Sequence, residues 1–232
     1  MIKPAQVRDV VALLCLTLTL SCGETITEAP SNPNDRELLN AARCGDASDI
    51  QEALRAGANP DSSEVYINQA EAETGNRRYA LELAARSGNV EALRALLQGG
   101  ADPKGEGARS ALGVAAFRGD HDMLTILLDG GVPPRPAILN AASMGGHTET
   151  LKFLLARGVP ADNKMTQETL LYAVREHRTE HVKILLDAGV PVADEYGSHI
   201  LQEAKQSQFS DIVELLRKAG ATDKPAGGTD PD

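Results

Sequence analysis

The chain of 232 residues contains no tryptophan, and aromatic residues make up only 3% of it. This scarcity disfavours a β-sandwich, whose strands favour β-branched and aromatic side chains. The sequence also lacks a Walker-type phosphate loop, a glycine-rich dinucleotide fingerprint and a paired CxxC motif. A formal net charge of −10 disfavours nonspecific binding to nucleic acid. We therefore expect a core of Leu, Ala, Ile and Val in closely packed helices, with no cofactor and no nucleic acid partner.

Long apolar runs are also missing, apart from one near the amino terminus. The first nine residues carry Lys3 and Arg8, and residues 10–20 then hold no charge. A helix of that length spans about 16 Å, which is too short for the roughly 30 Å hydrocarbon core of a bilayer. A charged start followed by a short apolar segment is typical of a secretory signal peptide.

The segment Leu18-Thr19-Leu20-Ser21-Cys22 at the end of this run resembles the lipobox of bacterial lipoproteins. Thr19 departs from the leucine that the family prefers at that position. The resemblance implies that the signal peptide is cleaved before Cys22 and that the Cys22 thiol carries lipid. Gly23, in place of an aspartate, favours the outer membrane of a Gram-negative cell. The resemblance therefore predicts a lipoprotein of the bacterial cell envelope that faces the periplasm.

Two other interpretations of Cys22 remain open. It would be an ordinary residue if cleavage occurred elsewhere, for instance after Gly23, or it would pair with Cys44 in an oxidising compartment. If Cys15 leaves with the signal peptide and Cys22 carries lipid, Cys44 is a single thiol, which we interpret as a small, buried or half-buried apolar residue. If no signal peptide is present, the alternative is a cytosolic adaptor.

Four regions are expected along the chain. Residues 1–21 form the signal peptide, and residues 22–34 form a flexible tether, since GETITEAPSNPN is polar and contains two prolines. A repeat domain covers residues 35–222. Residues 223–232, DKPAGGTDPD, are expected to be a disordered tail, because they are too polar and too rich in proline and glycine to fold.

Internal repetition covers almost all of the chain after the tether. Six leucines mark the repeats: Leu38, Leu81, Leu112, Leu139, Leu170 and Leu201. An alanine stands three residues after each leucine, an aliphatic residue twelve after it and a glycine nineteen after it. The position seven after it is glycine in four repeats, and His177 or Gln208 in the other two. This pattern predicts a helix, a turn and a second helix that ends at the last glycine. One such pair cannot bury its apolar face, but a stack of pairs can.

The segment LELAARSGNVEALRALLQGGADP, residues 81–103, resembles an ankyrin repeat, as do the segments from the later repeat leucines. The resemblance implies an all-α ankyrin-repeat solenoid of about six helix-turn-helix repeats, with short or absent β-hairpin fingers because most connections are shorter than the family's. Only the connection from Gly57 to Leu81 is longer. The family's Thr-Pro-Leu-His is replaced by YALE, SALG, AILN and HILQ in four repeats, so its usual Thr–His hydrogen bonds lack their residues there.

The resemblance further implies a module that binds another protein through a concave face, formed by the ends of the first helices and the residues before them. Arginine is frequent at these positions and forms forked bonds with carboxylates. The predicted partner-binding residues are Arg43, Arg78, Arg86, Arg109, Phe117, Arg118, Arg175 and, in the long connection 61–78, Tyr66. A partner with an acidic patch would fit them. Arginines that simply stay solvated at exposed positions would give the same pattern.

The segment HRTEH, from His177 to His181, matches the inverted zinc-protease pattern. The repeat places His177 in a turn and His181 in the following helix, so the two histidines straddle a helix boundary. We therefore predict no catalytic residue and no metal site. A zinc hydrolase is the rival class of function. Among binding proteins, an immunity or inhibitor protein that neutralises a periplasmic toxin or enzyme is the sharper alternative.

Overall fold

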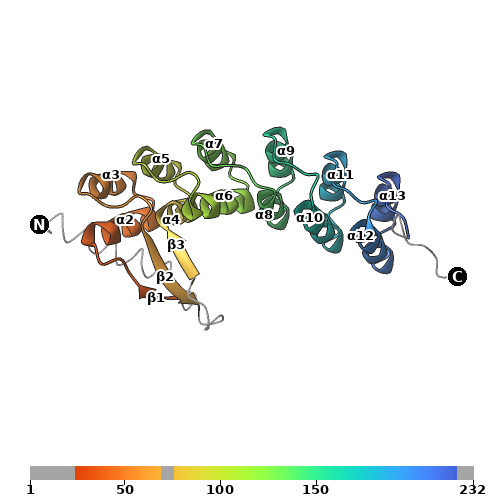
Figure 1. Ribbon diagram of the computed structural model, residues 1–232, viewed down its shortest axis with the longest axis horizontal. Coiled ribbons are helices and arrows are strands. Elements are labelled where there is room, and N and C mark those ends of the chain that lie inside the picture. Colours follow the sequence, from red (N-terminus) through yellow and green to blue (C-terminus); the bar gives the residue numbers. More distant parts are fainter. Residues whose placement is uncertain (1–23, 69–75, 224–232) are drawn as a thin grey trace, which may run out of the picture. The chain divides into compact units, whose positions relative to one another are not determined.

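A computed structural model of the chain describes residues 24–68 and 76–223 (Figure 1). These residues form twelve helices and three strands. They divide into two compact units. The first unit takes in the residues up to Ala115 together with Asp122–Pro133, and the second takes in Ala116–His121 and the residues from Pro134 onward. The predicted signal peptide, Cys22 and all but the first residue of the predicted tail lie outside the described residues.

Each repeat contributes two antiparallel helices joined by a tight turn. The first helices are α2 (Pro33–Cys44), α4 (Ala80–Ser87), α6 (Glu106–Arg118), α8 (Ala137–Gly145), α10 (Lys164–Arg175) and α12 (Glu195–Gln206). The second helices are α3 (Ala47–Arg55), α5 (Val90–Gln98), α7 (His121–Asp129), α9 (Thr148–Ala156), α11 (Thr179–Asp187) and α13 (Ser210–Lys218). Within each unit the first helices form one layer and the second helices form another (Figure 1). The six predicted helix pairs are confirmed.

The turn between the two helices of every repeat has a positive φ angle, at the position predicted from the repeat. The four turn glycines have φ between 70° and 82°, and His177 and Gln208 have φ of 51° and 60°. The glycine that follows each second helix also has a positive φ, for example 94° at Gly100. Only glycine adopts this region without steric cost, which explains its regular recurrence.

The core of each unit is built from the repeated leucine and alanine positions. The six repeat leucines are at most 1% exposed, and the alanines three residues later are at most 7% exposed. Small side chains at the alanine positions allow neighbouring first helices to approach closely. The aliphatic residue of the second helix is fully buried in five repeats, and Val213 on α13 is only partly buried. Within the described residues, no later helix follows α13 to cover it.

Four of the first helices are longer than the repeat pattern predicts, since α2 begins five residues before its repeat leucine and α6, α10 and α12 begin six residues before theirs. Local capping explains two of these starts. Asn163 and Thr166 form a capping box at the start of α10, and the Asp194 side chain accepts a hydrogen bond from the Gly197 amide at the start of α12. The short connections therefore add a helical turn instead of a β-hairpin finger.

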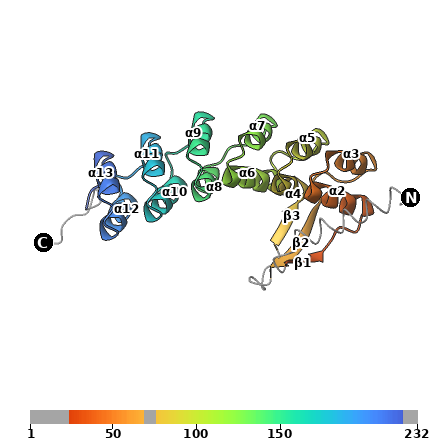
Figure 2. The ribbon, with the colours of Figure 1, turned by 180° about the vertical axis from the view of Figure 1, so that it is seen from behind.

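The long connection after the first repeat forms β2 (Ser63–Asn68) and β3 (Asn76–Tyr79), which pair antiparallel. A third strand, β1 (Glu24–Glu28), pairs antiparallel with the other edge of β2. The sheet lies on the side of the first helices, away from α3 and α5 (Figures 1 and 2).

The prediction of a flexible tether over residues 22–34 needs correction, because β1 lies within it and α2 begins at Pro33. The stretch ETITE contains three β-branched residues in a row, which suit an extended strand once a partner strand is available. Within the described residues, no helix combines the length and the apolar character needed to cross a membrane.

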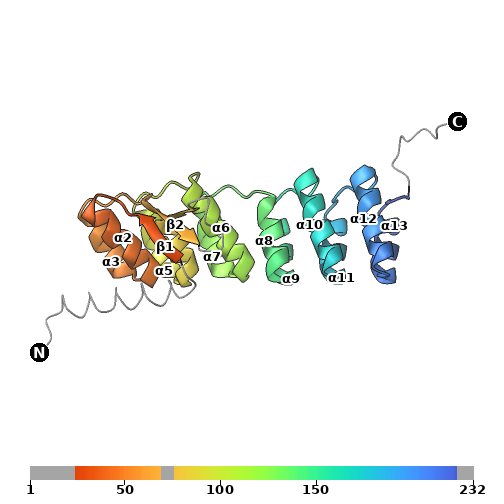
Figure 3. The same cartoon turned by 90° about the horizontal axis from the view of Figure 1, so that it is seen from below.

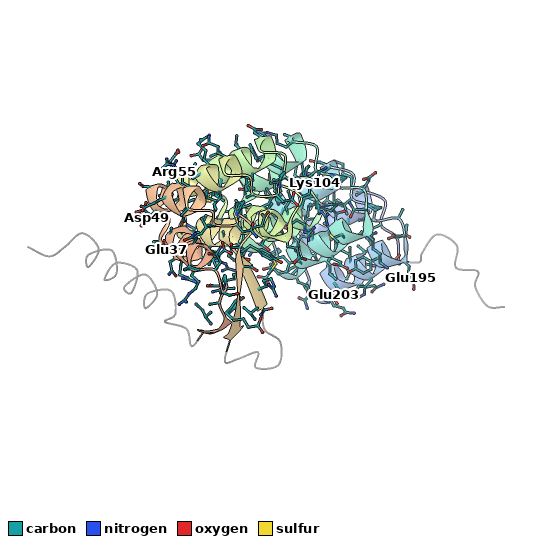
Figure 4. All side chains as sticks on the ribbon, turned by 60° about the vertical axis from the view of Figure 1, so that its left-hand side comes forward. Glu37, Asp49, Arg55, Lys104, Glu195 and Glu203 are labelled. Atoms are coloured by element: carbon teal, nitrogen blue, oxygen red, sulfur yellow. The ribbon has the colours of Figure 1, made fainter. Side chains whose placement is uncertain are left out.

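The outer end of the first repeat is polar, as the end of a repeat stack must be. Glu37 on α2 and Asp49 and Arg55 on α3 project from this end (Figure 4). In the second unit, Lys205 and Arg217 both form ion pairs with Asp223, directly after the last repeat.

Candidate functional site

Arg43, at the end of α2, is held inside the first unit. Its Nη2 atom lies 2.5 Å from Oε1 of Glu64 on β2, and its Nη1 atom donates a hydrogen bond to Asn40. The two charged side chains are only 7% and 6% exposed. The prediction that Arg43 contacts a partner is therefore corrected: its guanidinium joins the sheet to the first repeat, because the long connection brings a carboxylate against it.

Arg78 and Tyr66 also contact each other within the sheet. The Arg78 guanidinium carbon lies 3.6 Å from the centre of the Tyr66 ring, and Arg78 is the cross-strand neighbour of Glu64. A cation over an aromatic face is attracted by the ring quadrupole, so this contact stabilises the pairing of β2 and β3. Both side chains are half-buried. Tyr66 thus packs back onto its own sheet, which leaves only part of its ring for another protein.

Arg86 and Arg109 form ion pairs within their own helices. The Nε atom of Arg86 donates to Glu82 at 2.8 Å, and Nη2 of Arg109 donates to Glu106 at 3.1 Å. Glu106 also accepts a hydrogen bond from the Tyr79 hydroxyl at 2.9 Å. Burial of the Tyr79 ring, together with this hydrogen bond, raises the pKa of Tyr79. The Arg86 side chain remains 48% exposed, and the Arg109 side chain 34%.

The predicted residues of the second unit lie on its surface. Phe117 is 52% exposed, and Arg118 beside it is exposed as well. Arg175 on α10 donates to Glu203 on α12 at 3.1 Å while its side chain stays 54% exposed. This hydrogen bond lowers the pKa of Glu203 and raises the pKa of Arg175. The helices α8, α10 and α12 lie side by side in this unit, so Arg175 and Glu203 connect neighbouring repeats (Figure 3).

Met144, at the end of α8, was missed by the sequence analysis. It is 46% exposed and stands five residues after its repeat leucine, as Phe117 does in the preceding repeat. A Cβ atom added at Gly145 would overlap the carbonyl oxygen of Phe117, so the two helix ends are in close contact. The shared repeat position was visible in the sequence and was the signal that could have identified Met144.

The two histidines of the HRTEH segment face different neighbours. The His177 ring stacks on Phe209 with the ring centres 4.0 Å apart, and its Nε2 lies 3.4 Å from Asp211. The buried His181 ring instead lies between Ser143 and Thr148 of the preceding repeat, at 3.4 Å and 3.0 Å from their hydroxyls. Across residues 24–68 and 76–223, no group of three or more His, Cys, Asp or Glu side chains is arranged to hold a metal.

Burial has a clear electrostatic effect at His181. Removal from water lowers the pKa of its imidazole, and the positive charge of Arg178 lowers it further. Arg178 itself donates hydrogen bonds to the carbonyl oxygens of Ser143 and Met144, at the carboxyl end of α8. A cation at this end of a helix is favoured by the helix dipole. His181 and Arg178 therefore join consecutive repeats, and the structure assigns them a packing role.

The same repeats are found when the chain is compared with known proteins. A family model described as ankyrin repeats (3 copies) matches residues 38–136 and, again, residues 138–225. No curated protein matches the chain.

Solved structures with a similar fold include several ankyrin repeat domains. One from Acinetobacter baumannii AYE is 27% identical and has a TM-score of 0.62, with 80% of this chain and 98% of that domain covered. The domain of human ASB11 is 24% identical and has a TM-score of 0.60, with 83% of this chain and 88% of that domain covered. The domain of Bcl-3, from the IkappaB family, is 22% identical and has a TM-score of 0.63, with 84% of this chain and 89% of that domain covered. The last two likenesses show the fold alone.

Proposed function

Because the chain belongs to the ankyrin repeat family, whose repeats generally bind other proteins, we propose that it is a protein-binding module anchored by lipid in the bacterial cell envelope. The observation that carries the proposal is the combination of six stacked repeats with an amino-terminal segment that ends in Cys22. The mechanism is surface complementarity between the exposed ends of the first helices and the partner.

The start of β1 supports a particular arrangement of the anchor. Only Gly23 separates Cys22 from Glu24, the first residue of β1. Two residues of extended chain span at most about 7 Å. A lipid on Cys22 would therefore hold the sheet of the first unit close to the membrane surface. Two or three acyl chains would make this attachment stable, since one chain alone binds only marginally.

The anchor is tested by replacing Cys22 with Ala and expressing both proteins in a Gram-negative bacterium. We expect wild type to incorporate a fatty-acid analogue and to fractionate with outer membranes, and the variant to incorporate none. The variant should be released from membranes or remain as the uncleaved precursor. Equal labelling of the two proteins would refute lipidation at Cys22, whatever the repeats bind.

The binding face is tested by changing the exposed arginines. Arg118→Glu combined with Arg86→Gln should greatly reduce cross-linking of a partner in envelope extracts, and wild-type cross-linking should weaken as salt rises. Gln is chosen at position 86 because a glutamate there would repel Glu82. Glu91→Lys with Asp122→Lys, on α5 and α7, is the matched control for charge reversal and should leave cross-linking unchanged. Equal cross-linking by both double variants would exclude an electrostatic contribution from the arginines.

A sharper form of the proposal is an immunity or inhibitor protein. The exposed Arg86, Arg118 and Arg175 suit an acidic surface on a periplasmic toxin or enzyme. If a captured partner has a measurable activity, the purified chain should inhibit it, and the Arg86→Gln, Arg118→Glu variant should inhibit less. Full activity of the partner in the complex would leave a binding module without inhibitory function.

A further inference from the structure

Three large apolar side chains of the described residues are exposed: Phe117, Met144 and Met165. Phe117 and Met144 occupy the same position of two consecutive repeats, five residues after the repeat leucine. In the other four repeats this position holds Arg43, Arg86, Arg175 and Gln206. A polar or charged residue is thus the rule at this position, and the two apolar residues are adjacent exceptions.

Phe117 differs from the other phenylalanines of the chain. Phe153 stacks on the ring of His121 with the ring centres 4.8 Å apart, and Phe209 stacks on His177 at 4.0 Å. Both are half-buried in these contacts, whereas half of the Phe117 surface faces solvent. Phe117 is thus the most exposed of the three phenylalanines, and a second exposed apolar residue holds the same position of the next repeat.

The two exposed side chains stand on neighbouring helix ends of the second unit. Gly145 packs against the Phe117 carbonyl, and a Cβ atom at Gly119 would lie 2.7 Å from the His147 ring. The carboxyl ends of α6 and α8 and the turns after them are therefore in contact. Tyr172 extends this area, because Arg178 lies 5.4 Å over its ring and also binds the Met144 carbonyl. We name Phe117, Met144 and Tyr172 the apolar patch.

Arginines border the apolar patch. Arg118 follows Phe117 in sequence, Arg178 bonds the end of the Met144 helix, and Arg175 stands at the equivalent position on α10. The carboxylate of Glu203 is already paired with Arg175, and the other carboxylates of these turns are Asp120 and Glu176. Three arginines therefore stand at or directly after the helix ends that carry the patch, in a chain whose net charge is −10.

On the basis of the function proposed above, we infer that the apolar patch anchors an acidic segment of the partner protein. An aromatic or aliphatic side chain of that segment packs between Phe117 and Met144, and neighbouring carboxylates bind the bordering arginines. Aromatic and methionine side chains are enriched at the centres of protein interfaces, and the flexible methionine adapts to the shape of the inserted group. Burial at the centre, with charge pairs at its edge, is the arrangement in which a few residues supply most of the affinity.

The test uses a library of random 12-residue peptides displayed on phage and selected on the purified full chain. We expect the selected peptides to carry Phe, Leu or Met with Asp or Glu close by. Phe117→Ala combined with Met144→Ala should weaken the binding of a selected synthetic peptide by about tenfold or more. Met165→Ala is the matched control, because Met165 is equally exposed and lies at the opposite end of α10.

A spectroscopic reporter locates the binding directly. Since the chain has no tryptophan, Phe117→Trp adds a single indole at the patch, and its emission should shift to shorter wavelength when the peptide binds. Lys152→Trp, exposed on α9, is the control reporter and should not shift. Circular dichroism of every variant verifies that the fold is retained, as expected for exposed positions.

Several results would overturn the inference. Failure to enrich any peptide, enrichment of basic peptides, or equal binding by the double alanine variant would exclude the apolar patch as the anchor. A blue shift of the Phe117→Trp reporter with vesicles of phosphatidylethanolamine and phosphatidylglycerol would assign the patch to the membrane, and a shift with protein concentration alone would assign it to a second copy. If the double alanine variant still cross-links the envelope partner, the inference fails while the proposed function stands.

Discussion

The two units differ in the side chains at the ends of some of their first helices. In the first unit, Arg43 and Arg86 both bind a carboxylate of the same unit, and the Arg43 pair is buried. In the second unit, Phe117 and Met144 occupy the equivalent position and are half-exposed. The first unit also contains the only three strands of the described residues, and the second contains all five histidines of the chain. One repeat position can therefore hold a sheet in place or present a surface, depending on which side chains the neighbouring elements bring against it.

The largest expected effect comes from breaking the buried ion pair of the first unit. Arg43→Met should lower the free energy of unfolding by about 3–5 kcal/mol, because Glu64 is left buried without its cation. Arg175→Met, which removes the equivalent exposed pair of the second unit, should cost at most about 1 kcal/mol. Urea unfolding followed by circular dichroism measures both. Adding Glu64→Leu to Arg43→Met should recover much of the loss, and equal losses at Arg43 and Arg175 would contradict the comparison.

The cores of the two units should respond alike, in contrast to their surfaces. Leu127 on α7 and Leu185 on α11 occupy the same repeat position, and both are fully buried. Replacing either with Ala should destabilise its unit by about 2–5 kcal/mol through lost burial and the remaining cavity. Thermal and urea unfolding of the two variants provide the measurement. A loss confined to one unit would show that the repeats are not equivalent in their packing.

The second unit alone should respond to acid through a buried histidine. The pKa of His181 in the folded protein is lowered by burial and by Arg178, while Glu180 opposes and His147 adds to the shift. The unfolded chain therefore binds the proton more readily, so stability is complete above the unfolded pKa of about 6.5 and falls as pH decreases through the folded-state pKa.

We expect His181→Gln to reduce the difference in unfolding free energy between about pH 7.5 and about pH 5. The glutamine can keep hydrogen bonds to Ser143 or Thr148 without taking up a proton. His199→Gln, at an exposed position of α12, is the control for the substitution itself. An identical pH dependence in wild type and His181→Gln would exclude His181 as the group responsible.

The smallest expected effect concerns the turns. Gln208 has φ of 60° at a position where the first unit has glycine, and a side chain there is strained. Gln208→Gly should stabilise the protein by up to about 1 kcal/mol, and Gly88→Ala should destabilise it by about 1 kcal/mol. Differential scanning calorimetry of the two variants checks the opposite signs. Destabilisation by Gln208→Gly would mean that the side chain makes a contact worth more than the strain.

The repeat pattern predicted the helix pairs well because every repeat places the same residue types at the same positions. Leucine, alanine and glycine at fixed spacings define a buried face, a close contact and a positive-φ turn, and all six turns have the predicted geometry. The long starts of α10 and α12 could have been read from Asn163 and Asp194, which cap these helices. The strand β1 could not, because a short polar stretch becomes a strand only when a distant edge accepts its hydrogen bonds.

The candidate site was less predictable than the fold for a similar reason. Arg43 and Arg175 occupy the same repeat position, yet one is buried and the other is exposed. Glu64 lies on β2 and Glu203 lies on α12. In each case another helix stands in the sequence between the arginine's helix and the element that carries the glutamate. Repeat position alone therefore identifies which residues end the first helices, and the neighbouring elements decide whether each one packs, pairs or faces solvent.

The pairing of β1 with β2 has a consequence for the order in which the first unit folds. Every helix pair is closed by contacts between residues that are close in sequence, which form quickly because little loop entropy is lost. β1 pairs with residues about 40 positions later, at the far side of the whole first repeat. During synthesis, which proceeds from the amino terminus, β1 cannot pair until the first repeat and β2 have been made. Although β1 precedes β2 and β3 in the sequence, it is thus among the last elements of the first unit to pair. A chain truncated before Ser63 lacks β2, the strand with which β1 pairs.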